Sequence, residues 1–132
     1  MWQAPAPRPI RYRHVQLLCG SHVLSEADNW YVPDRLTADM NRLLDTTDTP
    51  FGRVVRPLAP YRETFEVRQL WSPLGHGWEQ TAPPPPTSGI LRIPAALFEH
   101  RAVLYTRDHE PFSEVDEVYQ RDVVAFPPPP AE

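Results

Sequence analysis

The chain has 132 residues, which is enough for one domain with its own hydrophobic core but too few for two. A net charge of −4 at pH 7 and a pI near 5.7 argue against binding to nucleic acid or to an anionic membrane surface. No apolar run approaches the roughly 20 residues of a membrane-spanning helix. The single cysteine, Cys19, cannot form an internal disulfide, and together these features predict a cytoplasmic protein.

Proline is unusually frequent: the chain has 18 proline residues, and most of these residues lie in three clusters. Proline lacks the N–H group that helices and sheet ladders require. We therefore expect a Pro-rich tail over residues 1–9, a stiff loop within residues 72–89 and a second tail over residues 127–132. The folded domain is predicted to span residues 10–126.

The first part of the domain is predicted to form a hairpin and a helix. Residues 10–19 alternate and are rich in β-formers, residues 20–21 form a turn, and residues 22–32 return as a second strand. Residues 38–46 then place Met40, Leu43 and Leu44 on one face of a short helix, with Thr37 as its N-cap. We expect this helix to cover one face of a sheet.

The rest of the domain is predicted to add strands to that sheet. Residues 48–52 favour a turn, residues 53–57 and 63–71 favour strands, and residues 94–98, which begin with Pro94, favour one or two helical turns. Residues 101–105 and 112–124 are predicted to form a last hairpin. These elements indicate an α+β fold: a mainly antiparallel sheet of about five strands with short helices on one face.

An internal repeat relates the two hairpins. Residues 24–31, LSEADNWY, align without gaps with residues 112–119, FSEVDEVY, and upstream Arg13 falls on Arg101 and Val15 on Val103. We interpret the domain as two related β-hairpins that pair with each other.

The second hairpin is rich in acidic residues, most of which we expect to be solvated, as surface carboxylates usually are. Because side chains alternate along a strand, Glu114 and Asp116 lie on one face, whereas Glu117 shares the other face with Val115 and Tyr119. A carboxylate on such a face must reach water or be paired. All 13 basic residues are arginines, which bind carboxylates through two parallel hydrogen bonds. The arginines in or beside predicted strands are Arg13, Arg53, Arg62, Arg68 and Arg101.

Motifs for metal or cofactor binding are not found in the sequence. The five histidines form neither an HExxH motif nor a cluster with cysteine, and there is no Gly-rich phosphate loop. Ser25 and Ser113 lack the surroundings of a nucleophile elbow. We therefore expect no metal and no organic cofactor.

Several short segments carry a family resemblance. They are Leu17-Leu18-Cys19, Val32-Pro33 followed by Leu36-Thr37, then Thr49-Pro50-Phe51-Gly52-Arg53, a downstream Phe65, and a last hairpin with an acid in a strand. In this order, over about residues 11–126, the chain resembles the C-terminal two-thirds of the chorismate–pyruvate lyase family. Its members release pyruvate from chorismate and leave 4-hydroxybenzoate for ubiquinone synthesis. The resemblance implies an antiparallel sheet with helices on one side, related to the effector-binding (UTRA) domains of bacterial transcription regulators, and a reaction without cofactor.

The resemblance also implies a catalytic glutamate in the last hairpin. Counting from the proline after the turn places it at Asp116. The internal repeat, which allows for a turn one residue longer, places it at Glu117, the assignment that we favour.

The ligand-binding residues implied by the resemblance come from the first strand and from the TPxGR segment. The family's arginine falls on His14, with Arg13 one position away on the opposite face. Phe51 replaces a leucine whose backbone helps to bind the aromatic product, and Gly52 and Arg53 follow it. The implied ligand is a small aromatic carboxylic acid.

Two functions from different classes remain open. The chain is either a chorismate lyase of low or absent activity, or a non-catalytic domain that binds an aromatic acid or a protein partner. The sequence has no counterpart of the family's N-terminal helical portion, and its Asp28-Asn29 stands where the family has Gly-Arg. We expect apolar surface to remain uncovered and to be covered by a second copy in a homodimer, by a missing N-terminal segment or by another partner.

Overall fold

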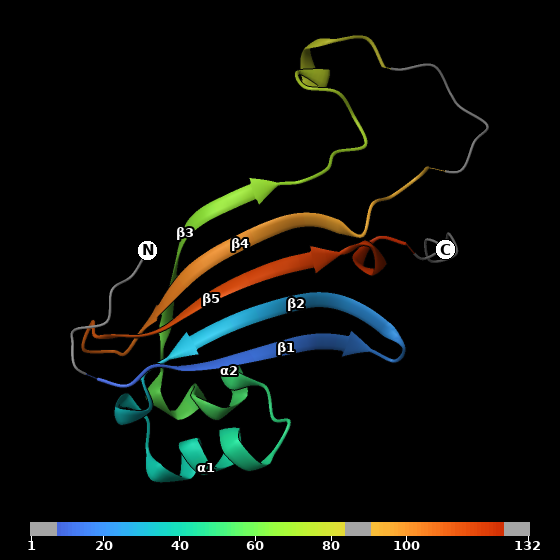
Figure 1. Cartoon of the computed structure of the whole chain (residues 1–132). Coiled ribbons are helices and arrows are strands. Elements are labelled where there is room, and N and C mark those ends of the chain that lie inside the picture. Colours follow the sequence, from blue (N-terminus) through green and yellow to red (C-terminus); the bar gives the residue numbers. More distant parts are fainter. Residues whose placement is uncertain (1–7, 84–90, 126–132) are drawn as a thin grey trace, which may run out of the picture.

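The fold is a single sheet whose neighbouring strands are all antiparallel (Figure 1). The computed structural model describes residues 8–83 and 91–125, so the predicted tails, apart from residues 8–9, and the Pro84–Pro86 part of the loop lie outside the described residues. The strands, in their order across the sheet, are β1 (Arg11–Cys19), β2 (His22–Tyr31), β5 (Pro111–Gln120), β4 (Ala96–Tyr105) and β3 (Tyr61–Gln69). The predicted sheet of about five antiparallel strands is confirmed.

The two halves of the internal repeat meet in the middle of the sheet. Strand β2 pairs with β5 so that Asp28 lies opposite its repeat counterpart Asp116. Ser25 lies opposite Tyr119 and Tyr31 opposite Ser113, so each repeat segment runs antiparallel to the other. The two hairpins therefore pair through their second strands, about a local two-fold axis between the two aspartates.

Two short helices cover one face of the sheet (Figure 1). Helix α1 (Ala38–Thr46) begins at the predicted cap, because the Thr37 hydroxyl oxygen accepts a hydrogen bond of 3.2 Å from the Met40 N–H. Helix α2 (Phe51–Val54) follows after a short loop. The buried side chains of this layer are Tyr31, Leu36, Met40, Leu44, Phe51, Val54, Val55 and Phe112.

The strand predicted over residues 53–57 is wrong. The chain there forms the end of α2 and then a 3-10 helix, Arg56–Leu58. Helical geometry places Val54 and Val55, exposed by 5% and 0%, in the core, and this packing outweighs the strand propensity of two adjacent valines. The turn predicted over residues 48–52 is also too long at its end, because α2 begins at Phe51.

The helical turns predicted over residues 94–98 are also wrong, because β4 begins at Ala96. Leu97 is only 4% exposed, and its carbonyl accepts hydrogen bonds from the N–H groups of Leu70 and Trp71 at 2.9 and 3.1 Å. Pairing with β3 on one side and β5 on the other satisfies the backbone as a helix would, and it also buries Leu97.

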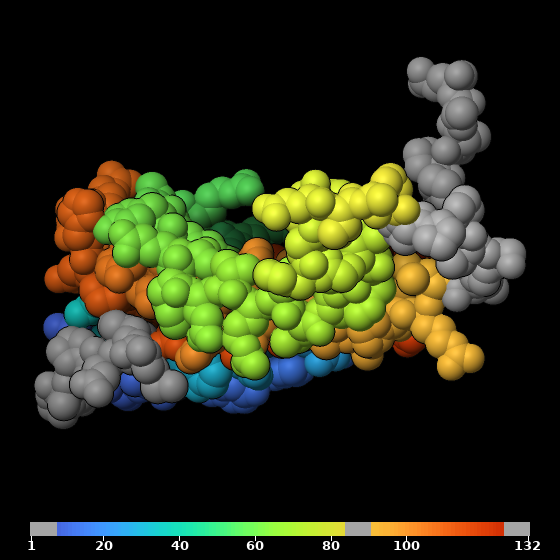
Figure 2. All heavy atoms as spheres, turned by 90° about the horizontal axis from the view of Figure 1, so that it is seen from above, coloured from blue at the N-terminus to red at the C-terminus, as the bar shows by residue number. Residues whose placement is uncertain are grey.

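The remaining differences are at the ends of elements. Strand β5 ends at Gln120 and continues as a 3-10 helix, Arg121–Val123. The described part of the predicted loop contains one 3-10 helix, Trp78–Gln80. Figure 2, which looks down on the molecule, shows β3 (lime) running across the near surface into this loop (yellow). Within residues 8–83 and 91–125, no helix is long and apolar enough to cross a membrane.

Candidate functional site

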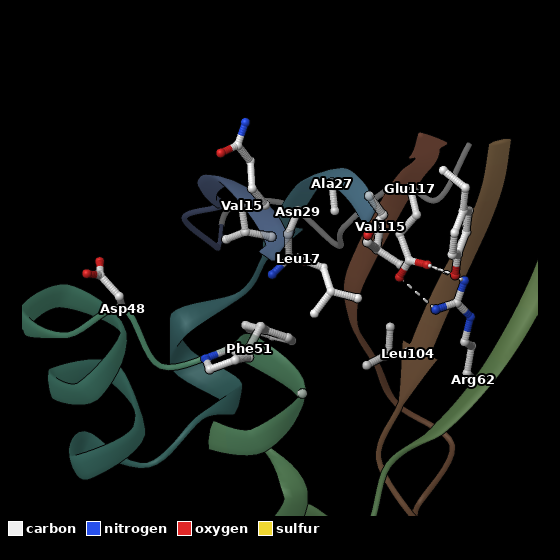
Figure 3. A pocket seen from close by; sticks show the side chains of 15 residues that line it. Val15, Leu17, Ala27, Asn29, Asp48, Phe51, Arg62, Leu104, Val115 and Glu117 are labelled. Atoms are coloured by element: carbon white, nitrogen blue, oxygen red, sulfur yellow. Dashed lines mark hydrogen bonds and ion pairs between the residues drawn. The ribbon is translucent and has the colours of Figure 1, made fainter. Parts of the chain in front are cut away.

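A cavity of about 460 Å³ lies between the sheet and the segment that carries α2 (Figure 3). Its apolar lining residues are Val15, Leu17, Ala27, Pro50, Phe51, Leu104 and Val115. Its polar lining residues include Asn29, Arg62, Glu117 and Tyr119. A mostly apolar cavity of a few hundred Å³ with a few polar groups is typical of a small-molecule site.

Glu117 forms the polar side of this cavity. It lies opposite Ala27 of β2, on the face of the sheet that the helices cover, and its side chain is 19% exposed. Its Oε1 accepts a hydrogen bond of 2.9 Å from Arg62 Nη1, and its Oε2 accepts one of 3.0 Å from the Tyr119 hydroxyl. Burial, with the nearby Glu117 carboxylate, raises the pKa of Tyr119, so this phenol remains a hydrogen-bond donor. The predicted partly buried carboxylate beside an arginine is therefore present, and the arginine is Arg62 of β3.

Asp116, the other candidate for the acid, lies on the opposite face of the sheet. Its Oδ2 is 3.9 Å from Arg101 Nε, and the same arginine binds Glu66 and Glu114 at 3.0 and 3.2 Å. Burial, followed by the neighbouring Glu99, raises the pKa of Asp116 to about 6. The structure therefore has the orientation that the internal repeat predicts, with Glu117 toward the cavity and Asp116 away from it.

His14 does not reach the cavity. It lies on the face opposite to it, where its Nδ1 is 2.9 Å from Asp28 Oδ1. This contact raises the pKa of His14, and hydrogen bonds from Tyr12 and His14 lower the pKa of Asp28. Arg13 lies on the cavity side, opposite Asn29, although its side chain is not part of the cavity wall.

The predicted residues of the TPxGR segment are divided. Phe51 and Gly52 line the cavity, whereas Arg53 is exposed and does not. The Phe51 ring is fixed between Tyr31 and Phe112, with ring centroids 5.3 and 6.3 Å away. Phe51 therefore forms a rigid apolar wall of the site.

Several lining residues were not predicted from the sequence. Asn29 is buried in the middle of β2, between the equally inward-facing Ala27 and Tyr31. An amide at an inward position of an alternating strand is the signal that could have drawn attention to it. Leu17 and Leu104 carried no such signal, because apolar residues at those positions are expected in any sheet.

A second cavity, of about 350 Å³, lies within residues 69–79, at the start of the long loop. It contains the indole rings of Trp71 and Trp78. These rings therefore line a different cavity from Glu117. Within the described ranges, no three His, Cys, Asp or Glu side chains are grouped so that they could hold a metal ion.

The chain is similar in sequence to a curated protein. No family model matches the chain. This chain is 55% identical over 122 residues to the uncharacterized protein y4mC of Sinorhizobium fredii (strain NBRC 101917 / NGR234). The match covers 92% of this chain and 52% of the relative, so the chain spans about half the length of the curated relative that it matches.

A solved structure with a similar fold matches most of the chain. It is described as the ligand-binding domain of a "putative GntR-family transcriptional regulator" from Bordetella bronchiseptica. The TM-score is 0.47 at 14% sequence identity, and the match covers 90% of this chain and 89% of that one.

Proposed function

We propose that this chain is a non-catalytic domain that binds a small aromatic carboxylic acid carrying a hydroxyl group. The observation that carries the proposal is the Glu117–Arg62 pair on the wall of a largely apolar cavity. The cavity has room for a single aromatic ring with short substituents. The resemblance to chorismate–pyruvate lyases, whose product is 4-hydroxybenzoate, points to the same class of ligand.

Glu117 is the proposed partner of the ligand hydroxyl. A carboxylate offers about four lone-pair sites, and hydrogen bonds from Arg62 Nη1, Arg62 Nη2 and the Tyr119 hydroxyl use three of them. Arg62 and Tyr119 hold the carboxylate in place, and a remaining lone pair can accept the ligand's hydroxyl proton. Phe51 and Val115 would contact the ring.

Binding is favoured over lyase activity by the charges around the cavity. Chorismate carries two carboxylates, and breaking its enolpyruvyl ether requires groups that stabilise developing negative charge. Among the described residues, the cavity wall has one arginine, Arg62, and this arginine is already paired with Glu117. We therefore expect product-like acids to bind without turnover.

Calorimetry on the full chain tests the proposal. Titration with 4-hydroxybenzoate should give saturable heat, and benzoate, which lacks the hydroxyl, should bind more weakly. Pyruvate release from chorismate, followed with lactate dehydrogenase, should stay at the background rate. Robust pyruvate release would establish the lyase instead, and absence of binding to both acids would refute ligand binding in this cavity.

A further inference from the structure

Asn29 presents a buried hydrogen-bond donor that has no acceptor among the described residues. The residue is 3% exposed, and its Oδ1 accepts a hydrogen bond of 2.5 Å from the hydroxyl of Ser113, which is fully buried. In this arrangement Oδ1 is the end of the amide that contacts Ser113, and Nδ2 is the other end. Nδ2 is buried and has no hydrogen-bond partner in the described parts of the chain. Buried amide N–H groups without a partner are rare in native proteins because their desolvation is not compensated.

This donor belongs to the cavity. Asn29 is one of its lining residues, and Figure 3 shows it above Phe51, on the side away from Glu117 and Arg62. The two polar ends of the cavity therefore differ: one offers a carboxylate and the other offers an amide donor. A ligand that satisfies both must carry a hydrogen-bond donor at one end and an acceptor at the other.

Arg13 adds a second donor, and a positive charge, beside Asn29. It lies directly opposite Asn29 in the β1–β2 ladder, and side chains so placed are within about 5 Å at Cβ. Its Nη1 is also buried without a partner in the described residues. The acids that could pair with it are engaged elsewhere, since Asp28 binds Tyr12 and His14 on the other face and Asp45 binds Arg11.

The one other acid at the cavity, Asp48, does not compete for this position. It is exposed, and its carboxylate points away from the cavity in Figure 3. The end of the cavity at Asn29 is therefore the end with an unsatisfied donor, and the charge of Arg13 lies next to it on the neighbouring strand.

We infer that Asn29, oriented by Ser113 and supported by the charge of Arg13, is the carboxylate-binding end of the cavity. This inference rests on the proposed function and assigns the orientation of its ligand. The carboxylate lies at Asn29, the ring lies against Phe51, and the hydroxyl points to Glu117. Asn29 is in this view the residue that selects acids over neutral aromatic molecules of the same shape.

The test compares an acid with a neutral molecule of similar shape. 4-Hydroxybenzoate and p-cresol share the ring and the hydroxyl, but p-cresol has a methyl group in place of the carboxylate. Their calorimetric affinities would be measured for the wild type, Asn29→Asp and Arg13→Gln. We expect each substitution to lower the affinity for 4-hydroxybenzoate by about tenfold or more and to leave p-cresol within about twofold.

Arg11→Gln is the matched control, because Arg11 lies two residues away on the same strand but binds Asp45 at the surface. It should retain the wild-type preference for the acid. Ser113→Ala, which frees the amide to rotate, should lower only the affinity for the acid. If Asn29→Asp does not fold, the affinities of Arg13→Gln for 4-hydroxybenzoate and p-cresol test the inference on their own.

The outcomes separate the two proposals. A wild-type chain that binds neither compound refutes the proposed function. A wild-type chain that binds both, with an acid preference unchanged by Asn29→Asp and Arg13→Gln, refutes the carboxylate position and leaves the cavity as the binding site. An equal loss of affinity for both compounds in the variants also refutes the carboxylate position, because such a loss indicates a general change of the cavity.

Discussion

Glu117 is the side chain whose chemistry bears most directly on ligand recognition. Replacing it with glutamine keeps the shape of the side chain but removes the negative charge that a ligand hydroxyl would contact. We expect Glu117→Gln to weaken binding of 4-hydroxybenzoate by roughly 1–3 kcal/mol, the value of a charge-assisted hydrogen bond. Calorimetry at pH 7 measures this loss.

The neighbouring residue provides the control. Asp116→Asn changes the same charge one position along β5, but on the face away from the cavity. Binding should be unchanged in this variant. A larger effect of Asp116→Asn than of Glu117→Gln would show that the acid that matters lies on the other face of the sheet.

Asp116 should instead affect stability in a pH-dependent way. Its pKa rises from 3.8 to about 6 on folding, mainly through burial. The folded chain therefore holds this proton over a pH range in which the unfolded chain has lost it, and stability falls as the pH rises through that range. Asp116→Asn removes the penalty, so we expect it to stabilise the protein by about 1 kcal/mol at pH 7, allowing for solvent screening.

Urea unfolding at pH 7 and at a pH well below 3.8 measures this difference. The gain should disappear at the lower pH, where the aspartate is protonated in both states. A gain of the same size at both values would indicate a packing effect and not the loss of an ionised carboxylate.

Among the elements, α1 depends on its N-terminal cap. Thr37 satisfies the Met40 N–H, and Met40 and Leu44 are the residues that α1 buries in the core. Thr37→Ala should lower the free energy of unfolding by about 1 kcal/mol, as loss of a capping hydroxyl generally does, and Thr37→Ser should retain most of it. Chemical denaturation of the three proteins provides the comparison, and equal stability of all three would mean that α1 is held by its packing alone.

The same helix shows which elements the sequence could predict. Residues 38–46 carry a cap, a helical spacing of apolar residues and no competing strand signal, and α1 has the predicted bounds. Arg53 to Pro57 carry strand-forming valines, but packing against Phe51 and Phe112 decides their conformation. Local propensity is weak compared with such burial, so the sequence alone does not decide whether this segment forms a strand or a helix.

Candidate site residues could be predicted only in part for a related reason. Alternation along β5 separates Glu117 from Asp116, and the repeat supplies the register, so one wall of the cavity follows from the sequence. The cavity itself depends on how far α2 stands from the sheet, which no local pattern encodes. Arg62 was one of five candidate arginines, and only the fold brings it to Glu117, 55 positions along the chain.

At the scale of the whole molecule, the two edges of the sheet differ. Edge strand β3 carries charges of both signs, and Arg62 and Arg68 form ion pairs with Glu117 of β5 and Glu99 of β4. Edge strand β1 carries its arginines in its first half, whereas residues 15–19 are uncharged. Leu17 and Leu18 there are 54% and 55% exposed. An uncharged, exposed edge strand is a template for pairing with another strand.

We therefore expect a second copy to pair with this chain through β1. Antiparallel pairing about a two-fold axis near Leu17 would bring the uncharged halves of both strands together and place apolar residues next to each other. Leu17 also lines the cavity, so the partner copy would cover its open β1 side. In Figure 1 this end of β1 extends beyond α1 and α2.

Leu18→Arg tests this arrangement without altering the cavity wall, which does not include Leu18. A charge on the edge strand opposes strand pairing, so light scattering over a dilution series should show a dimer for the wild type and a monomer for Leu18→Arg. Val67→Arg, at a 62% exposed position on β3, is the matched control and should remain dimeric. Dissociation by Val67→Arg alone would place the contact on the other edge, and a wild-type monomer at every concentration would show that the chain leaves β1 unpaired.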